Sequence, residues 1–569
     1  MACRTLLRPA MTAGRILPAM RVGPSSIKSR QRHVRLMSCL TLSLDPSRAS
    51  LAELKEAAID GVEEHVKREP PIRSRRENEN DGLVILASRT LAPLLDDDGF
   101  IARLISSTGH VLEKPKAVSV LTAAVDEVPT YDHQSDAFCS AEGLSILRGS
   151  AARVLPRHLR EEALIQGAKP SIEFSPPRAR FTGPLRVTVP LANTIFTNGK
   201  THSLTESLWE TGQQKPPRLQ HRVQKTKAEV VIPATDMGFG PKAVSAIMPG
   251  LVPITEPSKI LSSFGNILRQ ISLGGPSGAS TELERIIPPI TQLSRRTSGP
   301  LEVWALILPP EYVAKGLPLP RPIPSEPSAY NIQHEQYLAQ RTATLMGMLL
   351  AGGCRLHKVL SGGGGWGKKK GLLSLDTETK FGPSEEDDLD SFINSFNGIS
   401  GPAAEGGELA DRGQLTGSYV QFLTQAAYPT PELHSNLLNQ RWNPNPAQPT
   451  EPTATPDAPS PTTVFGTPGA PTVSPPTAVA AKAWQNLFGG FSSEGFFLET
   501  SDPQSVDAAV ATKINAPRSC LISARTHESD WGSRIQGNLY QDARVGEIDE
   551  SWEELGQQLA GSSGEEERW

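Results

Sequence analysis

Apolar positions near the start of the chain follow a helical spacing. Between positions 51 and 66, Leu, Ile and Val recur every three to five residues, which predicts an amphipathic helix over about 51–68. Ser50 and Glu53 have the spacing of a capping box, in which both side chains satisfy N–H groups at a helix start. The helix should end before Pro70, because proline cannot continue it.

Two continuous apolar runs follow this helix. Leu83–Ala87 and Ala117–Val125 show no alternation of polar and apolar residues, as expected for strands buried on both faces of a sheet. A further helix is predicted between them, around Phe100–Ser107. The order strand, helix, strand predicts a β-α-β unit with parallel strands and a right-handed crossover.

The middle of the chain favours antiparallel structure. Asn198-Gly199 is typical of a type I′ hairpin turn between two strands. Pro257–Leu273 is predicted to be a helix with proline in its first turn, and a Pro-rich connector leads to another helix at about 330–350. The predicted fold class is α/β in the broad sense, mixed α+β, with the β-α-β unit followed by antiparallel hairpins and helices. Further strands are predicted at 185–189, 191–197, 227–233 and 301–308.

Hydrophobic periodicity is lost beyond Asp376, where an acidic run and a Pro/Thr-rich stretch at 443–476 follow. We therefore predict that residues 376–569 form a long, mostly disordered C-terminal tail. Three short apolar islands interrupt it, and they are either docking segments that fold on a partner or segments that pack on the chain's own body. The islands are Tyr419–Leu423, Trp484–Phe497, and the set Trp552, Leu555 and Leu559.

Composition limits the number of folded units. The 569 residues include 50 prolines, nearly twice the average of about 5%, so much of the length should lie outside a packed core. One or two cores are expected. The predicted division is a leader at 1–44, a mixed α/β body at 45–308, a segment at 309–375 with the Pro-rich connector, a helix and a Gly/Lys-rich loop, and the tail at 376–569.

Charge is distributed unevenly along the chain. Residues 1–44 contain eight basic residues and no acidic residue before Asp45. This composition is typical of a mitochondrial transit peptide, which predicts import into the matrix and cleavage around 35–45; a basic arm that binds RNA is the alternative. Residues 45–375 have 39 basic and 33 acidic residues, whereas residues 376–569 have 10 and 28. The body therefore lacks the strong basic bias of a dedicated nucleic-acid-binding protein.

A Gly/Lys-rich segment, SGGGGWGKKKG at 361–371, is the most unusual local sequence. It matches the P-loop pattern except at Lys369, which replaces the Ser or Thr that holds magnesium. Converging backbone N–H groups and lysines suit a phosphate or an RNA backbone. The alternative is structural, with Trp366 packed on the body and the glycines allowing close passage. The candidate anion-binding residues are Gly362, Gly363, Gly364, Gly365, Gly367, Lys368, Lys369 and Lys370.

A second candidate site follows from the β-α-β unit, because ligands bind at the carboxyl ends of parallel strands. Ser88, Arg89 and Thr90 follow the first strand, and Asp126 and Glu127 follow the second. Together they offer a cation, hydroxyls and carboxylates to a small zwitterion such as an amino acid. In the alternative interpretation, Arg89 pairs with one of the two carboxylates and the hydroxyls cap the loop.

The segments Asp81–Leu95 (DGLVILASRTLAPLL) and Leu121–Pro129 (LTAAVDEVP) resemble the opening of FIST domains, a family of intracellular sensory domains. The resemblance covers about 50 of the 569 residues. It implies an α/β ligand-binding module without catalysis, for small ligands such as amino acids. It carries no binding residue over to this chain, and the Gly/Lys-rich segment has no counterpart in it.

Other catalytic or metal-binding patterns are missing from the sequence. The histidines lack zinc-site spacing, no G-x-S-x-G motif occurs, and the five cysteines form no C-x-x-C pair. We therefore expect no cofactor, no metal and no catalytic residue. The longest apolar run, Thr342–Gly352, is shorter than the ~18 residues that span a bilayer, so no transmembrane segment is expected.

The leading hypothesis is a non-catalytic mitochondrial matrix protein that binds a small ligand or an unknown protein partner. One alternative is a scaffold associated with mitochondrial RNA or ribosomes through the Gly/Lys-rich segment and a cluster of arginines at Arg73, Arg75 and Arg76. A second alternative is a P-loop-like nucleotide-binding enzyme.

Overall fold

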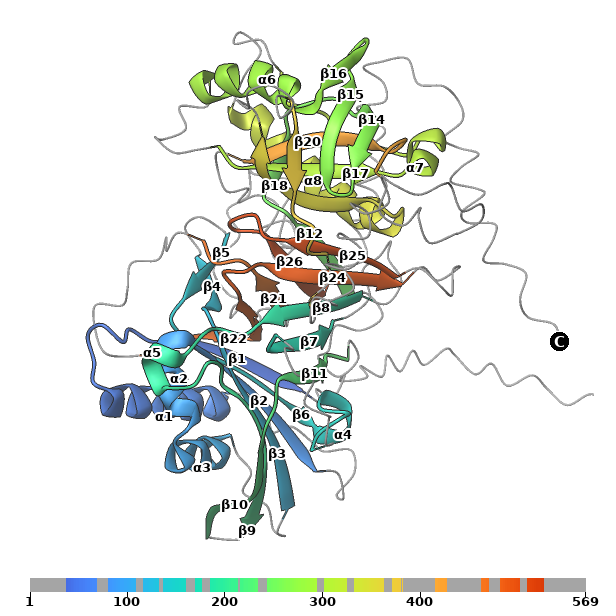
Figure 1. Cartoon of the computed structure of the whole chain (residues 1–569). Coiled ribbons are helices and arrows are strands. Elements are labelled where there is room, and N and C mark those ends of the chain that lie inside the picture. The colour runs from blue at the N-terminus through green and yellow to red at the C-terminus, as the bar shows by residue number, and fades with distance from the viewer. Residues whose placement is uncertain are drawn as a thin grey trace, which may run out of the picture. The chain divides into compact units, whose positions relative to one another are not determined.

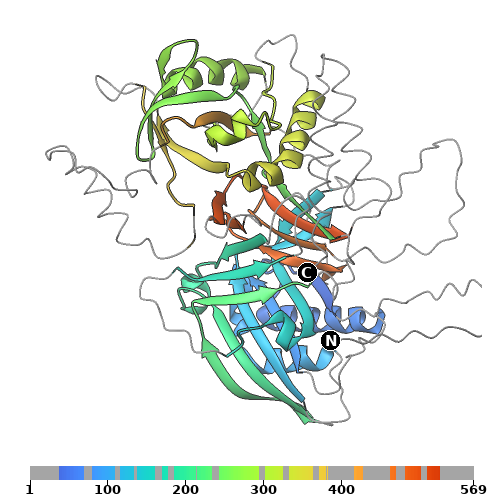
Figure 2. The same cartoon turned by 90° about the vertical axis from the view of Figure 1, so that its right-hand side faces the viewer.

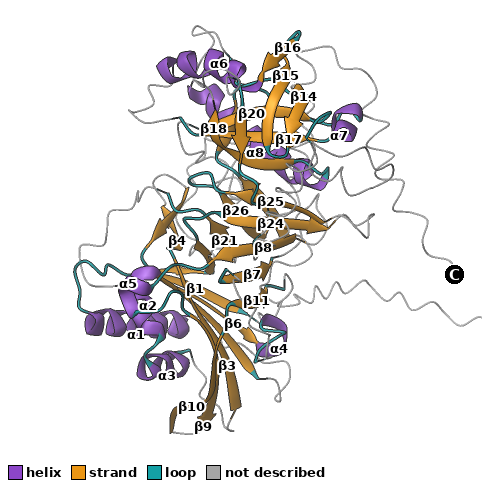
Figure 3. Ribbon diagram, in the orientation of Figure 1, coloured by secondary structure: helices purple, strands orange, loops and turns teal. Residues whose placement is uncertain are grey.

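The protein has a mixed α+β fold, seen in a computed structural model (Figure 1, Figure 3). The described residues, from Met37 onward, belong to one compact unit. The structure describes residues 37–68, 80–108, 116–132, 137–159, 169–176, 185–212, 215–233, 243–293, 301–324, 332–362, 371–379, 381, 415–426, 462–469, 481–501 and 509–525.

A seven-stranded sheet contains the predicted β-α-β unit. Its order is β10-β9-β3-β2-β6-β1-β22, and β2 and β3 are its parallel pair, in register from Asp81↔Val118 to Ser88↔Val125. The prediction of parallel pairing is therefore confirmed. The strands are β1 (Ser38–Ser43), β2 (Asp81–Ser88), β3 (Lys116–Val125), β6 (Gly143–Ser150), β9 (Leu204–Gly212), β10 (Lys215–Gln224) and β22 (Lys482–Gln485).

Helices cover one face of this sheet (Figure 1). They are α1 (Leu51–Arg68), the 3₁₀ turn η1 (Arg89–Leu91), α2 (Ala92–Leu95) and α3 (Asp98–Ser107). The predicted capping box is present, because the Ser50 N–H donates to Glu53 Oε2 at 2.8 Å and the Glu53 N–H donates to the Ser50 hydroxyl at 3.4 Å. Apolar side chains of α1 and α3 pack on β2 and β3 and are buried with them.

Two further sheets pack on the other face and enclose the largest apolar core. One has the order β11-β7-β8-β24-β25 and the other β12-β26-β21-β23. Their strands are β7 (Ser171–Ser175), β8 (Leu185–Pro190), β11 (Lys227–Val231), β12 (Ala243–Met248), β21 (Thr462–Gly466), β23 (Leu487–Phe491), β24 (Phe496–Ser501), β25 (Ala509–Ile514) and β26 (Cys520–Arg525). A short helix, α4 (Ala151–Val154), and a hairpin of β4 (Val128–Asp132) and β5 (Ala137–Ala141) complete this part.

A β-barrel occupies residues 251–426. β17 pairs with β18 and β20, and β20 pairs with β14, so that β14-β15-β19-β18-β17-β20 closes into a ring. The strands are β13 (Leu251–Pro253), β14 (Ser258–Phe264), β15 (Ile267–Ser272), β16 (Pro276–Gly278), β17 (Val303–Leu308), β18 (Arg355–Gly362), β19 (Leu373–Leu375) and β20 (Tyr419–Gln425).

Three helices accompany the barrel: α6 (Ala279–Leu293), α7 (Pro310–Ala314) and α8 (Ile332–Ala351). α8 contributes Leu338 to the barrel core and Leu345 and Leu349 to the large central core. It is the yellow helix beside the barrel strands in Figure 2. The predicted helix at 330–350 is thus confirmed. In the described part of the chain, no helix is long and apolar enough to cross a membrane.

Three local predictions in the middle of the chain were wrong. The strand predicted at 191–197 does not form, because residues 195–198 are helical. Pro257–Leu273 forms the β14–β15 hairpin instead of a helix, and Ile260, Leu268 and Ile271 are buried in the barrel core. Asn198-Gly199 ends a short helix, α5 (Ile195–Asn198), instead of forming a hairpin turn, and the φ of +78° at Gly199 suits this helix end.

Segments assigned to the leader and to the tail contribute strands to the described fold. Residues 38–43, assigned to the leader, form β1 in the interior of the seven-stranded sheet, between β6 and β22. Seven strands lie within 376–569, assigned to a mostly disordered tail. Two of the apolar islands pack on the chain's own body, since Phe422 and Phe488 are fully buried there. The third island, around Trp552, lies outside the described residues.

Candidate functional site

The parallel strands bring the predicted crevice residues to one edge of the sheet. Because β2 and β3 end side by side, Arg89 and Asp126 are neighbours: the Arg89 N–H donates to the Asp126 carbonyl oxygen at 3.5 Å. The Arg89 guanidinium lies 4.0 Å from the Asp126 carboxylate and 55% of the Arg89 side chain is exposed. This partly solvated ion pair is the one that the second interpretation of the crevice predicts.

Segments that the sequence did not connect with the crevice close over it. Thr90 donates its hydroxyl hydrogen to the Glu142 carboxylate, and the Gly143 N–H donates to the Ser88 hydroxyl at 3.0 Å. Ser493 donates both its N–H and its hydroxyl hydrogen to Asp126 Oδ2, each at 2.7 Å. The end of β23 therefore satisfies a carboxylate that the open-crevice interpretation would offer to a ligand.

Glu127 differs from its neighbours, because its Oε2 is buried without a hydrogen-bond partner in the described structure. Burial raises the pKa of Glu127, and the Glu142 and Asp126 carboxylates add to this, against a hydrogen bond from Ser140. The backbone of Glu127 is held by Phe491, whose N–H donates to the Glu127 carbonyl oxygen at 2.9 Å. The crevice thus contains one carboxyl group that favours its protonated form.

Close backbone packing explains how β23 reaches this edge. Gly489 lies so near β21 that a Cβ atom there would be 1.7 Å from the Val464 carbonyl oxygen. The Gly489 N–H donates to the Ser145 hydroxyl at 3.0 Å. Only glycine fits this crossing, which is the physical reason for the Gly-Gly pair in the second apolar island.

The Gly/Lys-rich segment joins two strands of a hairpin. Arg355–Leu360 is a strand as predicted, within β18, and β18 pairs antiparallel with β19. A P-loop needs a helix after its glycines, and strand β19 follows instead because Leu373 and Leu375 alternate with Ser374 into the core. Gly362 is the exposed last residue of β18. The other predicted anion-binding residues, Gly363, Gly364, Gly365, Gly367, Lys368, Lys369 and Lys370, lie outside the described residues.

Residues 192–203, here called the anchor loop, follow β8, pass the end of β3 at the same edge of the sheet and lead into β9. The Ala192 N–H donates to the Ala124 carbonyl oxygen at 3.0 Å, and the Ala124 N–H donates to the Ser203 carbonyl oxygen at 2.9 Å. Both ends of the loop are therefore fixed to β3, and α5 forms the turn between them.

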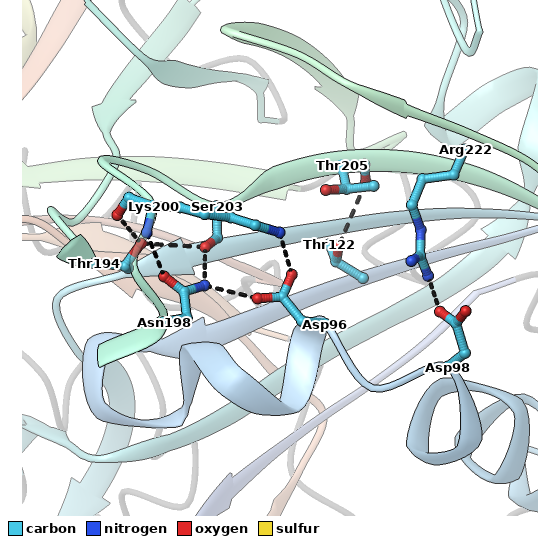
Figure 4. Close-up of polar contacts among 9 residues, drawn as sticks. All are labelled: Asp96, Asp98, Thr122, Thr194, Asn198, Lys200, Ser203, Thr205 and Arg222. Atoms are coloured by element: carbon cyan, nitrogen blue, oxygen red, sulfur yellow. Dashed lines mark hydrogen bonds and ion pairs between the residues drawn. The ribbon is translucent and has the colours of Figure 1, made fainter. Parts of the chain in front are cut away.

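Side-chain hydrogen bonds hold the anchor loop together (Figure 4). The Asn198 amide donates to Asp96 Oδ2 at 2.9 Å and to the Ser203 hydroxyl at 2.8 Å. Lys200 Nζ lies 2.6 Å from Asp96 Oδ1, and the Thr194 hydroxyl donates to the Lys200 carbonyl oxygen at 2.9 Å. Asp96 thus ties the loop to the end of α2, and the loop's polar groups satisfy one another.

The apolar side chains of α5 face solvent. Phe196 is 100% exposed and Ile195 is 44% exposed, although the hydrogen-bond network fixes the backbone that carries them. Sequence reasoning missed this site because Asn198-Gly199 was assigned to a hairpin. The available signal was Phe196, an aromatic residue two positions before Asn198-Gly199. A strand at this position would have buried it.

A second cluster, near the outer end of the same sheet, contains a buried ion pair. Glu206 of β9 and Lys225 are each at least 94% buried, and Lys225 Nζ lies 2.9 Å from Glu206 Oε2. The same oxygen accepts the Leu159 N–H at 2.7 Å. The His158 ring lies 3.7 Å away with 10% of its side chain exposed, and burial, with Lys225 nearby, lowers the pKa of His158 to about 4.

A groove of about 600 Å³ runs along α1. Its wall carries four carboxylates, of which Glu53 belongs to the capping box and Glu56 pairs with Arg103 at 2.5 Å. Its floor consists of Ala52, Ala57, Gly61 and Ala481.

Metal and thiol chemistry find no support among the described residues. They contain no group of three or more His, Cys, Asp or Glu side chains arranged to hold a metal ion. Burial raises the pKa of Cys354 and Cys520 to about 12, so both thiols stay protonated.

Comparison with protein families, with curated proteins and with solved structures finds no match for this chain.

Proposed function

We propose that this protein is a non-catalytic mitochondrial interaction protein that docks on a protein partner through the anchor loop. The observation that carries this proposal is the fully exposed Phe196 on a loop fixed by its own hydrogen bonds. An aromatic side chain that lies wholly in water gains the full free energy of burial when a partner covers it.

Binding through such a loop is energetically favourable. Burying a Phe side chain is worth about 1.5–3 kcal/mol, and aromatic residues are enriched among the few side chains that dominate interface energies. Because Asn198 and Lys200 already fix the loop to Asp96, little backbone entropy is lost when a partner closes over Phe196. Ile195 extends the contact beside it.

The mitochondrial part of the proposal rests on the acid-free basic leader. Since β1 begins at Ser38 and Leu40 and Leu42 are buried, we expect processing before Met37, within the N-terminal part of the range 35–45. Sequencing the N-terminus of the protein from purified mitochondria tests both points. Full-length protein in the cytosol, or a mature chain that begins beyond β1, would contradict the proposal.

The docking role is tested by placing a photo-reactive phenylalanine analogue at position 196 of the full-length chain in mitochondria. Leu360, on the barrel strand β18 and 60% exposed, is the matched control position. We expect one protein to cross-link at position 196 and not at 360, and Phe196→Ala to weaken its co-purification at least tenfold. Equal cross-linking at the two positions, or unchanged co-purification, would show that the anchor loop is not the docking point.

Binding of a small zwitterion at the crevice is a second candidate, in keeping with the FIST resemblance. It is favoured by two features, the partly exposed Arg89 guanidinium and the buried Glu127 Oε2, which has no hydrogen-bond partner in the described structure. Titration calorimetry with the common amino acids is the test. A heat of binding for an amino acid that disappears in Arg89→Ala and in Glu127→Gln would support this candidate. If no amino acid gives a heat of binding, the candidate is excluded.

A further inference from the structure

The short segment after α4 closes over a buried ion pair. Residues 155–159, here called the His158 strap, end α4 and place His158 and Leu159 above Glu206 and Lys225. The contact that fastens the strap is the hydrogen bond from the Leu159 N–H to Glu206 Oε2 at 2.7 Å. The strap is therefore attached to a carboxylate that Lys225 already neutralises.

The closed strap contains two unfavourable features. Leu159 has a φ of +55°, a left-handed conformation that is unfavourable for a residue with a Cβ atom. The His158 ring is buried, neither of its nitrogens makes a well-formed hydrogen bond in the described structure, and only the Ser207 backbone favours its charged form. A buried polar group without full hydrogen bonding is unfavourable. Opening the strap would remove both unfavourable features. The hydrogen bond to Glu206 and the packing around it therefore keep the strap closed against them.

The charges around His158 make this balance depend on its protonation. Lys225 and Glu206 both face the ring. His158 Nδ1 lies 3.7 Å from Glu206 Oε2, but that oxygen already meets Lys225 Nζ at 2.9 Å and the Leu159 N–H at 2.7 Å. Arg157 on the strap is paired with Glu229 of β11 at 3.1 Å, and His202 contacts the Lys225 carbonyl oxygen at 3.3 Å. A proton on His158 would place a second cation beside buried Lys225.

We propose that the His158 strap is an acid-sensitive latch, closed while His158 is neutral and opened when His158 takes up a proton. Open, the imidazolium is solvated, Leu159 relaxes, and the Glu206–Lys225 pair becomes accessible to water. The latch does not depend on the docking role of the anchor loop. The strap contacts Glu206 of β9 and Glu229 of β11, and among the described residues it makes no hydrogen bond to Phe196 or Asn198.

The pKa difference of His158 between the closed and open states determines the direction of the pH effect on strap opening and the pH range in which it occurs. The pKa of His158 is about 4 in the closed state, against an ordinary value of 6.5. Between these two values the open state binds a proton and the closed state does not, so the opening equilibrium shifts toward open tenfold for each pH unit of acidification. Above 6.5 and below about 4 it is independent of the protonation of His158.

Hydrogen exchange at single-amide resolution on the full-length chain tests the latch. The Leu159 amide is the reporter, because its hydrogen bond to Glu206 breaks on opening. Its protection factor, corrected for intrinsic exchange, should fall about tenfold per pH unit from 6.5 toward 4.5. The amide of Leu86, in the middle of β2, reports global unfolding and should stay more strongly protected than the Leu159 amide at every pH, because opening of the strap leaves β2 intact. Equal protection factors at the two amides would mean that Leu159 exchanges only through global unfolding and would overturn the proposal.

Two variants isolate the imidazole. His158→Gln should make protection of the Leu159 amide independent of pH, whereas His202→Gln, the matched change at the neighbouring histidine, should leave the tenfold slope intact. An unchanged slope in His158→Gln would overturn the latch. If His158→Gln does not fold, His158→Phe fills the same space with an uncharged ring, and a pH slope that persists there overturns the proposal equally.

Discussion

Glu206 on β9 and Glu127, between β3 and β4, are carboxylates with contrasting neighbours. Glu206 is almost fully buried, yet it is neutralised by Lys225 at 2.9 Å and accepts a backbone hydrogen bond. Glu127 is less buried but has Glu142 and Asp126 as neighbours, and one of its oxygens has no partner in the described structure. The comparison shows that burial alone does not determine the energetic cost of a carboxylate. Neighbouring charges and hydrogen-bond donors determine it as well.

Removing the charge of Glu206 should change the free energy of unfolding most. Glu206→Gln leaves Lys225 as an uncompensated buried cation, and removal of one partner of a buried pair costs about 3–5 kcal/mol. We expect a loss of that size in the free energy of unfolding by urea titration at pH 7. A loss below about 1 kcal/mol would show that water reaches Lys225 and that the pair is not buried.

Removing both charges sharpens the same comparison. Glu206→Gln with Lys225→Met leaves no buried charge, and such replacements of buried pairs are often neutral. The double variant should therefore recover most of the stability lost in Glu206→Gln, leaving the remaining cost of the Leu159 contact. A double variant as unstable as the single one would show that geometry, not charge, holds this cluster.

Glu127→Gln should act in the opposite direction, with a smaller effect. The folded protein raises the pKa of Glu127 above its ordinary 4.5, so ionisation at neutral pH costs stability. The glutamine variant avoids that cost and should melt at a higher temperature than the wild type at pH 7. The gain should vanish as the pH falls below 4.5, where both states of the wild type hold the proton; a gain that is equal at all pH values would contradict a charge origin.

Arg89→Ala should have the smallest effect. The Arg89–Asp126 pair spans 4.0 Å with 55% of the arginine side chain exposed, and exposed pairs contribute about 0–1 kcal/mol. Asp126 keeps its two bonds from Ser493, so we expect a change within about 0.5 kcal/mol in chemical denaturation. A large loss would mean that the guanidinium also offsets the charge of Glu127.

Elements with strong local signals were predictable from the sequence. The capping box at Ser50 and Glu53 marked the start of α1, and continuous apolar runs marked β2 and β3. Parallel pairing then followed from the chain order, which is why the convergence of Arg89 and Asp126 was foreseen. Local composition and connectivity suffice where a helix and its two strands lie close together in sequence.

Long-range pairing was not predictable. One of the two partners of β1 is β22, more than 400 residues away, and β8 pairs with β24. Those late strands are short apolar islands in a Pro- and Thr-rich region, so they lack the periodicity that identifies a strand without its partner. The same limit applies to the candidate site, because Ser493 and Phe491 close the crevice from segments that carry no local sign of it.

The late strands also determine when the protein can finish folding. β22, β24 and β26 pair with β1, β8 and β12, so a chain leaving the ribosome holds unfinished sheets until position 525 has emerged. Until then its apolar strands are exposed to wrong partners, a condition in which chaperones are needed. A chain that must cross a membrane unfolded would gain from this delay, because these sheets stay incomplete until its last strands are made.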